Sequence, residues 1–178
     1  MSNCFSQSRV LKYVEPISTL TTLGRNCFQD CIMLKSENVY DLFQSIIDIG
    51  DGVIQKIGTA YDTNTLILPG HKYTNIAARA FSNLWRHNEL IIGSTTDPCR
   101  WVEMLNSGQL TNNSTLFDAF GMSVDGASKI HIYLPTQDCT AENRERLLRA
   151  LNLLDYQGRM ELNINVLNAD FGWFTADT

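Results

Sequence analysis

The residues best placed for chemistry form the loop 93–99 (GSTTDPC), which follows the short apolar run 90–92. A polar loop between a strand and a helix can hold an anion, because the backbone N–H groups at the helix start are free to bind it. Asp97 argues against a phosphate there, since its carboxylate would compete for the same N–H groups. The loop is therefore either a ligand site or a turn in which Asp97 caps the next helix and Pro98 lies in its first turn, and we favour the turn.

Two other segments, 68–75 (LPGHKYTN) and 134–143 (LPTQDCTAEN), have the same strand-to-helix form. If the three strands are parallel, their loops meet at one edge of the sheet. Such an edge could bind a nucleotide or a phosphorylated small molecule, although neither glycine-rich nucleotide motif is present. The ligand-binding residues of this hypothesis are His71, Gly93, Ser94, Thr95, Thr96, Asp97 and Asp138. Ordinary turn chemistry explains the same residues and is the commoner reason for them.

The cysteines and histidines do not form a motif. Five cysteines are an odd number without the spacing of a disulfide framework, which predicts reduced thiols. Cys99 falls near a predicted helix start, where a thiol can become nucleophilic, but a small semi-buried residue is the commoner case. Cys27 and Cys31 lack a second ligand pair at a zinc-site spacing. We therefore predict no catalytic residue, no metal and no cofactor.

The composition favours contact with other proteins. Charged residues make up 19% of the chain, against roughly 25% in typical domains, and asparagine and threonine are each about as frequent as lysine and arginine together. The net charge is −5 and no basic run occurs, so we do not expect nucleic-acid binding. Neither a signal peptide nor an apolar run long enough for a membrane helix is present, which predicts a protein of the cytoplasm or of a virion.

Apolar periodicity predicts an α/β or α+β fold with a single mixed β-sheet of about four to six strands covered by helices. The predicted strands are 65–68, 90–92, 129–134 and 160–166, with one or two further strands within 10–23. The predicted helices are 36–47, 73–85, 98–106 and 140–154. The chain reads as one globular domain, 1–178, without an internal repeat, with an irregular insertion at 109–128 and an aromatic tail at 171–178.

These features favour a non-enzymatic structural or protein-interaction subunit of a larger assembly, either a homo-oligomer or a hetero-assembly. A viral or phage particle component would suit such a composition. Phe171, Trp173 and Phe174 are the candidate contact residues, because three large rings at a terminus pack on the core or dock on a partner. The alternative is a small α/β enzyme or ligand-binding domain that uses the loops described above.

Overall fold

The computed structural model describes residues 2–58, 65–81, 89–111, 128–151 and 162–170. Its strands form two parallel sheets. Sheet A contains β1 (Thr22–Leu23), β2 (Asp48–Ile49) and β4 (Asn75–Ile76), in that order. Sheet B contains β3 (Thr65–Leu68), β5 (Glu89–Ile92), β6 (Ser128–Leu134) and β7 (Leu162–Asn168). The helices are α1 (Ser36–Phe43), α2 (Trp101–Asn106) and α3 (Ala141–Ala150), with a short 3₁₀ turn at Thr136–Asp138.

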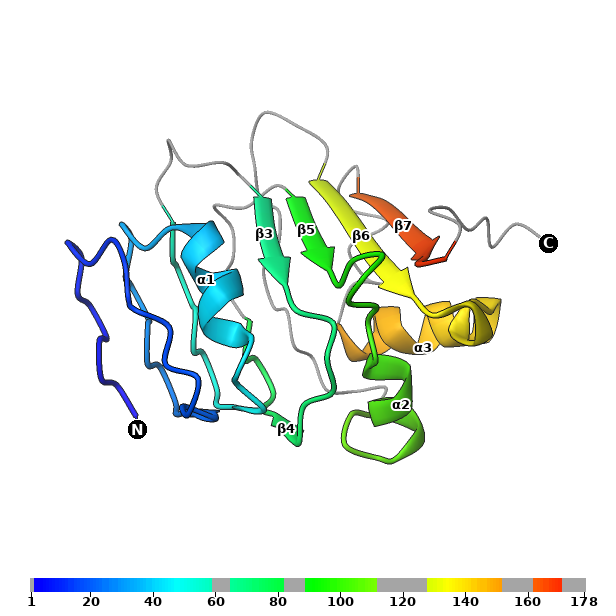
Figure 1. Cartoon of the computed structure of the whole chain (residues 1–178), viewed down its shortest axis with the longest axis horizontal. Helices are drawn as coiled ribbons and strands as arrows, with labels where there is room; N and C mark the ends of the chain where they lie inside the picture. Colours follow the sequence, from blue (N-terminus) through cyan, green and yellow to red (C-terminus); the bar gives the residue numbers. More distant parts are fainter. Residues whose placement is uncertain (1, 59–64, 82–88, 112–127, 152–161, 171–178) are drawn as a thin grey trace.

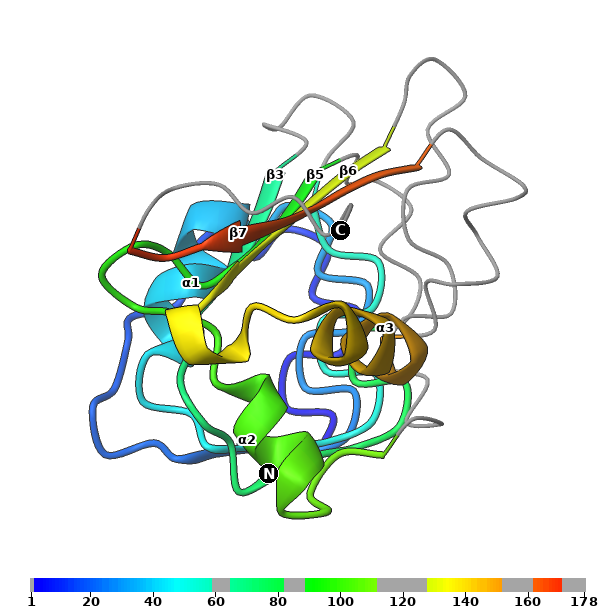
Figure 2. The same ribbon diagram turned by 90° about the vertical axis from the view of Figure 1, so that its right-hand side faces the viewer.

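The chain winds as a solenoid with two walls (Figure 1). Elements of one wall alternate along the chain with elements of the other: β1, α1, β2, β3, β4, β5, α2, β6, α3, β7. The helix α1 lies beside β3 and so takes a strand's place next to sheet B. The end-on view shows α2 and α3 below sheet B, so both helices lie on the same side of this sheet (Figure 2). Consecutive strands of a sheet are parallel because each coil of the chain runs in the same direction.

The backbone repeats its bends from coil to coil. Asn3, Asn26, Gly52 and Arg79 all have a positive φ, between 55° and 63°, and follow one another after 23, 26 and 27 residues. The last three each come four residues after the aligned sheet A residues Thr22, Asp48 and Asn75. The sequence predicts no internal repeat. For the backbone this prediction is wrong, because the coils share their geometry although most of their side chains differ.

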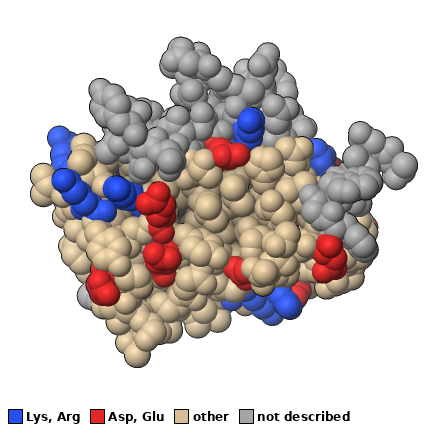
Figure 3. Space-filling model, turned by 45° about the horizontal axis from the view of Figure 1, so that its top comes forward, with Lys and Arg blue, Asp and Glu red and all other residues tan. Residues whose placement is uncertain are grey.

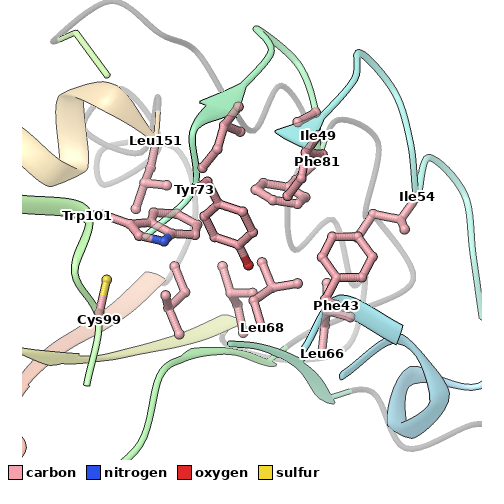
Figure 4. Close-up of a cluster of buried hydrophobic side chains, with 14 of the residues drawn as sticks. Phe43, Ile49, Ile54, Leu66, Leu68, Tyr73, Phe81, Cys99, Trp101 and Leu151 are labelled. Atoms are coloured by element: carbon pink, nitrogen blue, oxygen red, sulfur yellow. The ribbon is translucent and has the colours of Figure 1, made fainter. Parts of the chain in front are cut away.

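Apolar side chains from both walls fill the interior (Figure 4). The indole of Trp101 stacks on Phe81 with ring centroids 6.1 Å apart, and Tyr73 meets Trp101 edge-on at 6.0 Å. Phe81 also contacts Phe43 of α1. These rings are buried and join α1, the loop after β3 and α2 into one continuous core.

The α/β class is confirmed, and strands were predicted near the observed bounds of sheet B. The arrangement differs from the single mixed sheet that we predicted, since the described strands form two sheets and every pairing is parallel. The predicted helix 73–85 is wrong as far as residue 81: β4 and a turn occupy this segment, and residues 82–88 lie outside the described part. Its apolar residues Ile76, Ala80 and Phe81 are buried in β4 and the following turn instead of on a helix.

Candidate functional site

The three loops of the ligand-binding hypothesis do meet at one edge of sheet B. The strands β3, β5 and β6 are adjacent and parallel, so their carboxyl ends point the same way. The Asp97 carboxylate accepts a hydrogen bond from the backbone N–H of Gly70 at 2.9 Å. The backbone N–H of Cys99 donates to the carbonyl of Tyr133 at 2.6 Å, and that of Arg100 donates to Gly70 at 2.7 Å. The edge predicted from the sequence therefore exists.

The polar groups of loop 93–99 form hydrogen bonds within the loop or with neighbouring segments. The Ser94 hydroxyl accepts from the N–H of Asp97 at 3.0 Å and of Thr96 at 3.3 Å. The helix α2 begins only at Trp101, so Asp97 does not cap it and its carboxylate binds Gly70 instead. A methyl group on Gly93 would lie 2.7 Å from the carbonyl oxygen of Asp97. The loop is thus a tightly closed turn, and only Thr95 and Thr96 present exposed side chains.

His71 and Asp138 lie beside this turn in different surroundings. The Nε2 atom of His71 is 2.7 Å from the carbonyl oxygen of Ile46, and its ring packs on Tyr73. Asp138 Oδ2 is buried and has no hydrogen-bond partner among the described residues. Burial and the neighbouring Glu103 carboxylate raise the pKa of Asp138, against a smaller lowering effect of Arg100. The surroundings of Asp138 therefore disfavour ionisation of its carboxylate.

Asp138→Asn is expected to raise the Tm at neutral pH. The raised pKa means that the folded state holds this proton more tightly than the unfolded state does. The free energy that this group contributes to folding is present at acid pH. It is lost as the pH rises from the ordinary pKa of aspartate through the raised pKa of Asp138. The Tm gain of Asp138→Asn should shrink as the pH is lowered below that window, as scanning calorimetry from pH 3 to 7 would record. Asp41→Asn, at an exposed position of α1, is the control, and an equal gain there would contradict the assignment.

The thiol chemistry considered for Cys99 is not supported by its surroundings. Cys99 is fully buried, and burial raises the pKa of its thiol to about 12. Cys27 and Cys31 lie in a coil bend and not on a helix face. Among the described residues, no three His, Cys, Asp or Glu side chains are grouped to hold a metal ion.

The outer face of sheet B is open and mixed in character. Polar contacts join Thr65, Glu89 and His131: the Thr65 hydroxyl donates to Glu89 at 2.6 Å, and Glu89 lies 3.4 Å from Nε2 of His131, which is opposite Ile91. Ile67 is 38% exposed next to Ile91. Figure 3 views the molecule from this side with its top turned forward, and the charged side chains are scattered between broad uncharged areas. Within the described ranges, no helix is long and apolar enough to cross a membrane.

Within the described residues, most of the large apolar side chains that are exposed lie at the N-terminal end of the solenoid. Of the large apolar side chains exposed in the described part, Phe5, Val10, Tyr13 and Ile17 all come from this end, with Tyr13 and Ile17 each 55% exposed. A cavity of about 270 Å³ opens beside them. Its lining includes Phe5, Val14, Ile17, Leu20, Leu23 and Phe28, with Glu15 as the charged member. In the described sheet A, β1 pairs only with β2, so its other edge is open at this end.

Sequence reasoning missed this end because it read residues 10–23 as edge strands. A signal was present: Asn3-Cys4-Phe5 recurs as Asn26-Cys27-Phe28, and the two phenylalanine rings stack 5.4 Å apart with planes 2° from parallel. The three rings predicted as contacts, Phe171, Trp173 and Phe174, lie outside the described residues, as does most of the predicted insertion 109–128.

Comparison of the chain with protein-family models, with curated proteins and with solved structures finds no match.

Proposed function

We propose that the chain is a non-enzymatic structural subunit that associates with further copies of itself through its N-terminal end. The observation that carries the proposal is the concentration of exposed apolar side chains there, around a cavity and an open strand edge. An exposed edge strand next to apolar surface favours pairing with another chain. In solenoid proteins, terminal coils normally need a polar outer face to keep the end in water, and here Val10, Tyr13 and Ile17 interrupt the polar residues of that face.

A second copy fits this end in charge as well as in polarity. Arg9, Lys12 and Glu15 are all exposed in the N-terminal segment, so the segment carries charges of both signs. A two-fold axis brings the same patch of each copy together, so that a basic residue of one copy can face Glu15 of the other. Two β1 edges related by that axis would run antiparallel, which allows them to pair.

The double substitution Tyr13→Ser with Ile17→Ser is expected to weaken self-association by more than about tenfold. Each side chain is lost from both copies in a two-fold interface, and burial of such groups contributes on the order of 1 kcal/mol or more apiece. Ile67→Ser is the matched control, since it removes an exposed isoleucine from sheet B. Sedimentation velocity measures the dissociation constants of the double variant and of the control, for comparison with that of the parent chain. Equal weakening by the control, or no weakening by the double variant, would contradict a contact through the N-terminal end.

The ligand-binding alternative is supported by the convergence of the loops at one edge of sheet B. It is weakened by the hydrogen bonds of these loops, because the side chains of Asp97 and Ser94 already bind backbone N–H groups. Asp138 differs, since its buried Oδ2 atom has no hydrogen-bond partner among the described residues. A viral or phage particle as the setting of the assembly stays a prediction.

A further inference from the structure

Cys4 and Cys27 occupy equivalent positions in the first two coils. The N–H of Asn3 donates to the carbonyl of Arg25 at 2.8 Å, and the N–H of Phe5 donates to that of Cys27 at 2.9 Å. In a parallel ladder this pattern sets Asn3 opposite Asn26 and Phe5 opposite Phe28. The same register sets Cys4 opposite Cys27.

Several contacts hold this pair in place. The stacked rings of Phe5 and Phe28 follow the two cysteines directly, and both cysteines line the N-terminal cavity. Adjacent parallel chains lie about 4.8 Å apart, which is within the Cα separation of roughly 4.4–6.8 Å that a disulfide spans. A bond between the two sulfurs therefore needs no large movement of the backbone.

We propose that Cys4 and Cys27 form an oxidation site that a low-molecular-weight disulfide, such as oxidised glutathione, closes into a bond between the first two coils. The Cys4 thiolate attacks one sulfur of glutathione disulfide, so that a mixed disulfide forms and one glutathione thiolate leaves. The Cys27 thiolate then attacks Cys4 Sγ, and the second glutathione leaves. The two protein thiols lose two electrons and two protons, and glutathione disulfide is reduced to two thiols. Cys4 is exposed in the single chain, so this chemistry needs no second copy at the N-terminal end.

The surroundings of the two thiols determine the order of the steps. Cys4 is exposed and meets the oxidant first, whereas Cys27 is buried. Burial, with a further contribution from the nearby Cys4, raises the pKa of Cys27 to about 11. Few Cys27 thiolates exist at neutral pH, so ring closure should be the slower step and should speed up as the pH rises toward that value.

The test uses the reduced full chain, treated with oxidised glutathione at pH 7 and pH 9 and then alkylated. Before alkylation, the intact mass should fall by two hydrogens, faster at pH 9, without a lasting glutathione adduct on Cys4. After trypsin, the peptide ending at Arg9 should be linked to the peptide Asn26–Lys35, and tandem mass spectrometry should place the bond at Cys27 and not at Cys31.

Two variants distinguish formation of the Cys4–Cys27 disulfide from simple reaction of the exposed Cys4 with glutathione. Cys27→Val places in the second coil the residue that the third coil has at the equivalent position, Val53, and the variant should keep glutathione on Cys4. Cys31→Ala should close like the parent chain. A stable glutathione adduct on Cys4 of the parent, a Cys4–Cys4 dimer, a bond to Cys31 or no reaction would each overturn the proposal. Sedimentation under reducing conditions tests self-association separately, so the two proposals can fail independently.

Discussion

Gly93→Ala is expected to lower the free energy of unfolding by about 3 kcal/mol or more. An alanine Cβ at this position would lie 2.7 Å from the carbonyl oxygen of Asp97 and 2.8 Å from the backbone N of Cys99, so a backbone segment would have to move. The positive φ of Gly93, 74°, adds the usual strain of an L-residue in this region, on the order of 1 kcal/mol. Urea unfolding followed by tryptophan fluorescence, to which the buried Trp101 contributes, measures the change.

Gly108→Ala is the matched control for Gly93→Ala. Gly108 has nearly the same φ, 75°, but an added Cβ would meet nothing within 4 Å. This variant should lose only about 1 kcal/mol, because it suffers the backbone strain without the overlap. Equal losses at both positions would mean that loop 93–99 is less tightly closed than its hydrogen bonds indicate.

Asn38→Ala is expected to lower the free energy of unfolding by about 2 kcal/mol. Asn38 of α1 is 3% exposed, and its side-chain amide pairs with the backbone of Val14 as a neighbouring strand would. Its Oδ1 accepts from the N–H of Val14 at 2.8 Å, and its Nδ2 donates to the carbonyl of Val14 at 2.9 Å. Alanine would leave both backbone groups of Val14 without these partners, and each such partly buried group costs on the order of 1 kcal/mol.

Hydrogen exchange gives this prediction a local measurement. The Val14 amide should lose protection in Asn38→Ala and keep most of it in Asn38→Asp, which retains the acceptor but cannot donate to the Val14 carbonyl. Asn75→Ala is the control, since this exposed amide donates to the Asp48 carboxylate, and its loss should change stability by less than about 0.5 kcal/mol. Unchanged protection of Val14 in Asn38→Ala would show that α1 does not hold the N-terminal segment in this way.

The strands of sheet B could be predicted because each is a short apolar or alternating run bounded by turn residues. The helix α3 was also predictable: Thr140 caps it by accepting from the N–H of Asn143 at 3.1 Å. The winding of the chain was not, since β1, β2 and β4 are two-residue strands too short to show periodicity. Segment 73–81 was predicted as a helix for a related reason: its buried residues Ile76, Ala80 and Phe81 recur at a helical spacing, although they lie in β4 and the turn after it.

The position of the candidate site could be predicted from the sequence, but the close packing of its loops could not. Parallel strands bring the loops after β3 and β5 to one edge, as the sequence suggested. Whether such an edge is hollow depends on backbone carbonyls, and those of Asp97 and Pro98 fill the space next to Gly70. No residue type in loop 93–99 reveals that packing, whereas the repeated Asn-Cys-Phe could have drawn attention to the first two coils.

The measurement that tests the central claim most directly is the native mass of the reduced chain by light scattering behind size exclusion, across a range of protein concentrations. Association through the N-terminal end predicts a mass that rises with concentration from the monomer value of 20.1 kDa toward the dimer. Tyr13→Ser with Ile17→Ser should hold the mass near the monomer over the same range. A parent chain that stays at the monomer mass at every concentration would contradict the claim.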